Sequence, residues 1–191
     1  ARAKRSLRKS SLEASERVTP AGESTRIVEV HHRRGEVLRL LARYPESIEA
    51  FERMREAARS GGDRVREGEA LVETAYSQFL AFTSEGIQQC RRFATEALAI
   101  GRETADQHVV ARSLCYLGLV AQAEGDPAAG DRLFEESLGI ARAAGFADTV
   151  AVNLTWLGAH ANWRGEFTRA IDTSRQAMAE VRPRHHLEPG L

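Results

Sequence analysis

The 191-residue sequence has little of what stabilises most small non-helical domains. Its two cysteines, Cys90 and Cys115, are too few for a disulfide framework, so we expect both to be reduced and packed as small apolar side chains. Five prolines and an aromatic content of 6% argue against an all-β sandwich and favour helices. No apolar run approaches the roughly 18 residues of a membrane span, and no signal-peptide core is present. We therefore expect a soluble, cytoplasmic, helical protein of about one domain's length.

The chain also carries no net charge, because 27 acidic residues balance 27 basic ones. The chain as a whole has no charge excess that would attract nucleic acid or a membrane surface. Residues 1–25, which we interpret as a leader or linker, are the exception. Five basic residues lie within the first nine positions: Arg2, Lys4, Arg5, Arg8 and Lys9. An anionic partner and a solvated linker both remain open as explanations of this basic cluster. Nucleic acid is not an expected partner apart from a contact through this leader.

An internal repeat of about 40 residues is present. Gly118 and Gly158 are 40 residues apart, and so are Gly125 and Gly165. Moving back by the same interval aligns Tyr76 with Tyr116 and Gln78 with Gly118. A first copy begins near Gly35, 43 residues before Gln78, with Ala42 in place of the turn glycine. Four repeats fit the chain.

Each repeat is typical of two helices joined by a short turn, because apolar residues recur at helical spacing on both sides of Gly or Pro breakers. Asp126 is placed to cap a helix that starts at Pro127. The pattern predicts eight helices and no strand, at residues 26–42, 45–59, 63–83, 87–104, 107–124, 127–144, 147–164 and 167–181. Glycines recur inside first helices at Gly35, Gly118 and Gly158. Since a helix-interior glycine costs roughly 1 kcal/mol relative to alanine, we expect each to allow close approach of the second helix of its pair.

The motif Leu117-Gly118, Gly125-Asp126 and Phe134, with its echo Leu157-Gly158 and Gly165, resembles the tetratricopeptide repeat. The period of about 40, against the usual 34, is similar to the variant of maltose-regulon-activator-like regulators and of bacterial signalling ATPases, cyclases and kinases. This resemblance implies an all-α, right-handed superhelical array of antiparallel helix pairs, an α-solenoid. The array would span residues 26–181 as about four helix pairs, with residues 182–191 as a C-terminal tail.

The sequence shows no motif for catalysis. It contains neither of the glycine-rich phosphate-binding patterns, and no H-E-x-x-H or C-x-x-C spacing. His31 and His32 are adjacent and would point about 100° apart on a helix, so they cannot chelate one ion together. We expect no cofactor, no metal and no enzymatic activity. An enzyme would need a constellation of distant residues such as His32, Glu36 and Arg112.

The resemblance implies that the first helix of each pair lines a concave groove. The candidate partner-binding residues at these positions are His32, Glu36, Arg39, Phe79, Phe82, Arg112, Leu119, Gln122, Thr155, Asn162 and Trp163. Arg39 and Arg112 alone do not match the Lys and Asn set with which related arrays clamp a terminal carboxylate. Phe79, Phe82 and Trp163 favour an apolar or helical partner segment. The alternative that Phe79 and Phe82 are packed between repeats is equally compatible with the sequence. We expect Trp163, which lies beside a turn, to be exposed.

These features together predict a non-catalytic scaffold that binds a protein or peptide. It would be the interaction or sensor segment of a larger bacterial signalling or regulatory protein, and its partner could be another domain of that parent. The alternative is a small-molecule effector-sensing domain of a transcriptional regulator or signalling ATPase. No polar capping helix follows Val181, which favours a segment of a longer protein or an array end that meets another chain.

Overall fold

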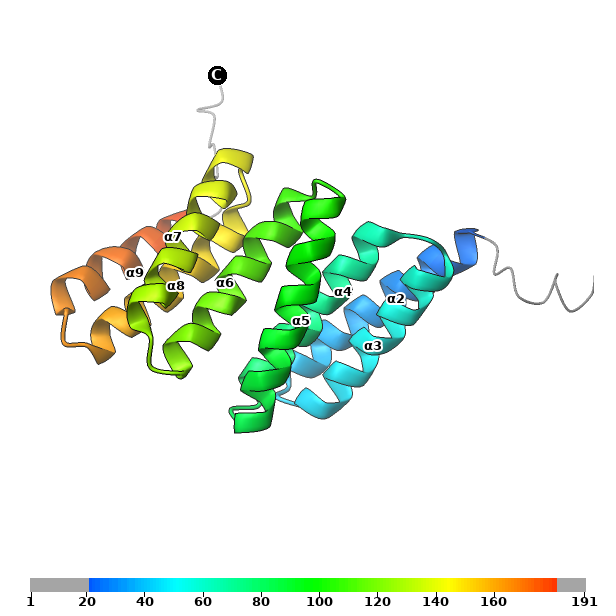
Figure 1. Ribbon diagram of the computed structural model, residues 1–191, viewed down its shortest axis with the longest axis horizontal. Helices are drawn as coiled ribbons and strands as arrows, with labels where there is room; N and C mark the ends of the chain where they lie inside the picture. The colour runs from blue at the N-terminus through cyan, green and yellow to red at the C-terminus, as the bar shows by residue number, and fades with distance from the viewer. Residues whose placement is uncertain (1–20, 182–191) are drawn as a thin grey trace, which may run out of the picture.

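The computed structural model describes residues 21–181, which fold entirely into α-helices and the turns between them (Figure 1). The predicted all-α solenoid is confirmed for these residues. Most helix bounds differ by one to three residues from those expected; α2 instead begins at Ala21, inside the segment interpreted as a leader. The helices are α2 (Ala21–Leu40), α3 (Tyr44–Ser60), α4 (Arg64–Leu80), α5 (Ser84–Glu103), α6 (Gln107–Ala123), α7 (Pro127–Ala144), α8 (Ala147–Trp163) and α9 (Phe167–Val181).

The helices stack in chain order along the long axis of the molecule, from α2 at one end to α9 at the other (Figure 1). Each helix packs on the next, and α2, α4, α6 and α8 also contact their counterparts in the neighbouring pair. The backbones of the second helices, α3, α5, α7 and α9, do not approach one another in this way. In the described part of the chain, only side-chain contacts join neighbouring second helices, such as the ion pair of Arg55 with Glu96. The first helices are therefore the inner layer of a curved array, and we call them the inner helices.

Every turn between helices contains one residue with a positive φ, at Ala42, Gly62, Phe82, Ala105, Gly125, Gly145 and Gly165. These residues recur at intervals of 20, with the single exception of an interval of 23 between Phe82 and Ala105. The three extra residues lie in and around α5, which has 20 residues where α3 has 17 and α7 has 18. The turn residues thus give the structural register of the repeat.

This register corrects the alignment of the second repeat expected from sequence. Ala75, not Gln78, stands seven residues before its turn, as Gly118 does before Gly125. Tyr76 therefore corresponds to Leu119 and not to Tyr116, whose counterpart is Glu73. The alignment was wrong by three residues because the three extra residues lie around α5. The turns on either side of α5 contain Phe82 and Ala105 and no glycine with a positive φ, so no glycine marked them in the sequence. All four inner helices thus carry a small residue at this position: Gly35, Ala75, Gly118 and Gly158.

Close approach of paired helices is confirmed at Gly118. A Cβ atom there would lie 3.2 Å from the carbonyl oxygen of Gly130 and 3.2 Å from the ring of Phe134. Close approach is also confirmed at Gly35, where a Cβ would lie 2.5 Å from the Phe51 ring of α3. Ser47, a small residue of α3, donates a hydrogen bond from Oγ to the Gly35 carbonyl at 2.9 Å.

Local signals in the sequence act as expected at the third turn. The Asp126 carboxylate accepts a hydrogen bond from the backbone N–H of Ala129 at 2.9 Å, and Pro127 opens α7. Cys90 and Cys115 are free thiols buried in the core, as predicted. Burial raises the pKa of each to about 12, so both stay protonated at neutral pH.

Candidate functional site

Two pockets lie on the inner helices and contain most of the predicted groove residues. The first, which we call the aromatic pocket, has a volume of about 210 Å³ and is lined by Phe79, Phe82, Ile87, Leu119, Gln122, Ala123, Trp156, His160 and Trp163. The second, which we call the central polar pocket, has a volume of about 200 Å³ and is lined by Glu36, Arg39, Tyr76, Arg112, Cys115, Tyr116, Asp148, Thr149 and Val152.

Phe79 and Phe82, whose exposure could not be predicted from the sequence, differ in the structure. Phe79 is 6% exposed and packs edge-on against Trp156, with ring centroids 5.7 Å apart. Phe82 is 72% exposed and Trp163 is 69% exposed. The expected exposure of Trp163 is confirmed. Leu119, predicted as a groove contact, is fully buried because α6 packs between its neighbours on both sides, so it forms only the floor of the aromatic pocket.

Phe82 occupies an unfavourable backbone conformation. Its φ is 51°, in the left-handed region, where four of the seven turns place glycine. A side chain with a Cβ pays roughly 1–2 kcal/mol there, and a bulky residue in this region is uncommon. Strain of this kind concentrates at functional sites. The conformation holds the Phe82 ring at the mouth of the aromatic pocket, 5.9 Å from the Phe79 ring.

His160 forms a wall of the aromatic pocket and behaves as an apolar ring. Burial, assisted by the charge of Arg164, lowers its pKa to about 4, so the imidazole is neutral at neutral pH. Its ring lies 5.1 Å from that of Trp163 and 6.0 Å from that of Trp156. The pocket is therefore uncharged and suits an apolar side chain.

Glu73 is the centre of a buried ion cluster behind the central polar pocket. The carboxylate is 4% exposed and accepts a hydrogen bond from each of Arg39 and Arg112, one on each oxygen. His32 Nε2 lies 3.9 Å from Glu73 Oε1 and 3.9 Å from Glu36 Oε1. One carboxylate of α4 thus joins α2 to α6 through three cationic or ionisable side chains.

The charges around Glu73 control its ionisation. Burial alone would raise the pKa of Glu73, but Arg112, His32 and Arg39 hold that pKa well below its ordinary value. In turn, Glu73 raises the pKa of His32 above its ordinary value, against the opposing effect of burial. At neutral pH the Glu73 carboxylate is ionised. Together with the two guanidinium groups of Arg39 and Arg112 it carries a net charge of one positive unit.

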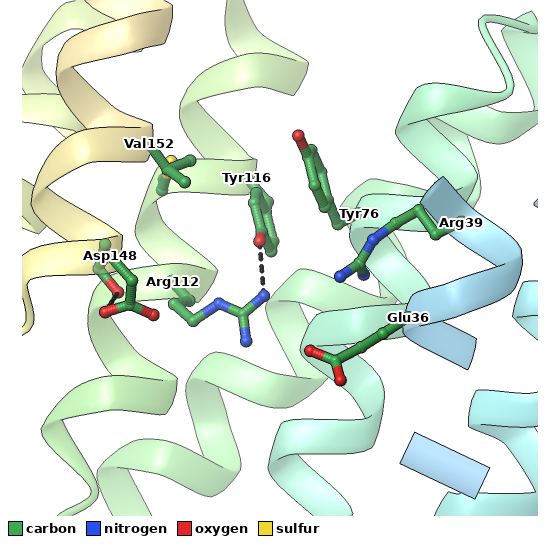
Figure 2. A pocket seen from close by; sticks show the side chains of 9 residues that line it. Glu36, Arg39, Tyr76, Arg112, Tyr116, Asp148 and Val152 are labelled. Carbon is green, nitrogen blue, oxygen red and sulfur yellow. Dashed lines mark hydrogen bonds between the residues drawn. The ribbon is translucent and has the colours of Figure 1, made fainter. Parts of the chain in front are cut away.

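Two tyrosines form the remaining wall of the central polar pocket (Figure 2). Tyr76 and Tyr116 stack with centroids 4.9 Å apart and parallel planes. Arg112 donates to the Tyr116 hydroxyl at 2.8 Å, and the Arg39 guanidinium lies 5.2 Å from the Tyr76 centroid. Figure 2 shows both guanidinium groups directed into the space between them, with the Glu36 carboxylate facing the same space.

Three predicted groove residues remain to be placed: Gln122, Thr155 and Asn162. Gln122 borders the aromatic pocket, where its amide donates to Asp131 at 2.9 Å. Thr155 and Asn162 line a third, more open cavity between α8 and α9 together with Phe167, Ile171 and Met178. The basic residues of the leader lie outside the described residues.

Sequence reasoning missed Glu73, Tyr76 and Tyr116 as site residues. The corrected register supplies the missing signal, because it places Tyr76 at the groove position occupied by Leu119 in the third repeat. No comparable signal marks Glu73. It stands in a helix interior, at a position that the uncorrected alignment did not associate with the groove.

Residues 21–181 offer no group of three or more His, Cys, Asp or Glu side chains arranged to hold a metal ion. Within the same residues, no helix combines the length and apolar character needed to cross a membrane. Neither a protein-family model nor a curated protein sequence matches the chain.

Proposed function

We propose that the protein is a non-catalytic scaffold of tetratricopeptide type that binds a protein or peptide segment on its inner face. The observation that carries this proposal is the pair of exposed rings, Phe82 and Trp163, flanking an apolar pocket formed by three helix pairs. Exposed aromatic side chains around a pre-formed pocket are typical of binding hot spots. The repeat resemblance favours a cytoplasmic bacterial signalling or regulatory protein as the context.

The volume of the aromatic pocket suits one large apolar side chain of the partner. Fully burying a Leu, Phe or Met side chain contributes roughly 1.5–3 kcal/mol. Covering the Phe82 and Trp163 rings adds to this, since both are mostly exposed in the free protein. A helical partner segment would present such an anchor with further contacts one or two turns away along the groove.

The outer face of α2 supports a second contact, with another domain of a parent protein or a further helix pair. Val30 and Val37 are 57% and 55% exposed. In the other inner helices the residues at the same distance from the turn are all buried against the preceding helix: Ala70 and Ser77 in α4, Ser113 and Val120 in α6, and Asn153 and His160 in α8. The first position of the array thus retains apolar residues where a preceding helix would pack.

The ionisable side chains support a binding role and not a catalytic one. His32, Glu36 and Arg112 do converge, as an enzyme would require, but they surround Glu73 in an ion cluster. Both cysteine thiols are buried and protonated, so neither is an accessible nucleophile.

Selection from a phage-displayed library of random 12-residue peptides tests the proposal. We expect the enriched peptides to share an aromatic or leucine anchor and to bind at least about tenfold more weakly to Phe82→Gly and Trp163→Ala variants. Exposed Leu40 at the end of α2 provides the matched control, since Leu40→Ala removes an apolar side chain outside the pocket. Equal binding of the selected peptides by all variants would remove the aromatic pocket from the proposal.

Effector sensing remains the second candidate function, and one observation favours it. All four inner helices contribute residues to the central polar pocket. Thermal unfolding in the presence of small metabolites distinguishes the two functions, because a ligand at 100 times its Kd stabilises the folded state by about 2.7 kcal/mol.

A further inference from the structure

We propose that the central polar pocket binds a small zwitterion of the α-amino acid class, with the ligand carboxylate on Arg39 and Arg112 and its ammonium group between Glu36 and Asp148. This site is separate from the aromatic pocket, with which it shares no lining residue. The inference therefore does not depend on the peptide-binding function.

The floor of the pocket is positively charged. Arg39 and Arg112 share one carboxylate, Glu73, and each gives it a single guanidinium nitrogen. A second nitrogen of Arg112 donates to the Tyr116 hydroxyl. Their side chains are 15% and 18% exposed, and what remains accessible faces the pocket (Figure 2). Two partly used guanidinium groups held in fixed positions suit a carboxylate, which accepts charge-assisted hydrogen bonds from such forks.

The rim of the pocket is negatively charged. Glu36 stands on α2 and Asp148 on α8. Both line the pocket, and their side chains are more exposed than those of the two arginines, at 36% and 71%. Each also lies near one histidine: Glu36 is 3.9 Å from His32, and Asp148 is 3.4 Å from His108. The hydrogen bond from His108 lowers the pKa of Asp148 to about 2, so this carboxylate is ionised at neutral pH. A floor of one sign under a rim of the other favours a ligand that carries both charges.

The size of the pocket restricts the ligand further. A volume of about 200 Å³ is below the roughly 300–1,000 Å³ of pockets for drug-sized molecules. Nucleotides and peptides of several residues are therefore too large to be enclosed. Tyr76 and Val152 give less polar walls for a ligand side chain.

Such a ligand would connect helices whose backbones lie apart. Within the described residues the backbone of α2 approaches those of α3 and α4 but not those of α6 or α8. A molecule held by Arg39 and Glu36 on one side and by Arg112 and Asp148 on the other would bridge the first and the last helix pair. Binding would thus stabilise the curvature of the whole array, which is the property a sensor needs.

Calorimetric titration with the set of standard L-amino acids tests the site. We expect at least one amino acid to bind, and its des-amino acid and its amide to bind at least about tenfold more weakly, because each lacks one of the two charges. Binding by no amino acid at millimolar concentration would overturn the proposal. Equal binding of the des-amino acid would also overturn it, since that result indicates a simple anion site.

Two substitutions test the binding at the rim and leave Glu73, Arg39 and Arg112 in place. Glu36→Gln and Asp148→Asn retain shape, and each should weaken amino acid binding by about tenfold. Glu135 on α7 is exposed and is not a lining residue of the pocket, so Glu135→Gln is the control. Unchanged affinity in both rim variants, or an equal loss in the control, would refute the assignment even where an amino acid binds. Peptide binding by the aromatic pocket should be the same in all three variants.

Discussion

Replacing Glu73 by alanine should cause one of the largest losses of stability available to a single substitution in this array. The change removes a carboxylate that is 4% exposed and leaves Arg39 and Arg112 mostly buried without their partner. Breaking a buried ion pair by deleting one member typically costs 3–5 kcal/mol, because the remaining charge is neither hydrated nor compensated. Against a total stability of roughly 5–15 kcal/mol, the variant would be marginal but measurable.

Glu69 supplies the matched control for this prediction. It lies one turn earlier on α4 and pairs with Arg66 near the surface, so Glu69→Ala should cost below about 1 kcal/mol. Urea unfolding followed by circular dichroism measures both variants, and an unchanged slope would show that the midpoint shift reports stability. Equal small losses in the two variants would refute the buried cluster as a source of stability.

The cost of Glu73→Ala should also depend on pH in a defined direction. The pKa of Glu73 is depressed, so its contribution is present above the unfolded value of about 4.3 and is lost as pH falls through the folded value. The pKa of His32 is raised, so its contribution is present below about 6.5 and is lost as pH rises through its folded value. The stability difference between wild type and variant should therefore be largest between about pH 5 and 6.5.

Three further predictions concern packing, capping and thiol reactivity. Phe79→Ala should lower the free energy of unfolding by about 3–5 kcal/mol. Phe82→Gly should keep it within about 1 kcal/mol of wild type, because relief of backbone strain offsets the lost packing. Urea midpoints in the reverse order would contradict both predictions. Asp126→Ala should cost about 0.5–2 kcal/mol by removing a helix cap, with Asp126→Asn nearly neutral in the same assay. Cys90 and Cys115 should react with a thiol reagent only upon unfolding, and rapid labelling of the native protein would contradict their burial.

The helices could be predicted from the sequence because their determinants are local. Pro127 and Asp126 fix the start of α7 by capping alone, and Gly125 and Gly165 mark turns that require a positive φ. The register of the second repeat could not be read in this way. Phe82 and Ala105 adopt the same positive-φ turn conformation as the glycines, but neither residue type predicts such a turn.

The ion cluster of the candidate site could not be predicted, for a different reason. Glu73 is in a helix interior and is charged, a combination usually typical of a solvated face. Its burial arises only when α2 brings Arg39 and α6 brings Arg112 against α4. Arg39 and Arg112 were expected to line a groove, and both line the central polar pocket. Their shared partner depends on contacts between residues 34 and 39 positions apart.

Whether a partner segment occupies the aromatic pocket is tested most directly by the fluorescence of Trp163. The chain has two tryptophans, and Trp156→Phe leaves Trp163 as the single reporter. Titration with a selected peptide should shift its emission to shorter wavelength, because the mostly exposed indole becomes buried on binding. Saturable peptide binding with no change in the emission of Trp163 would contradict the account.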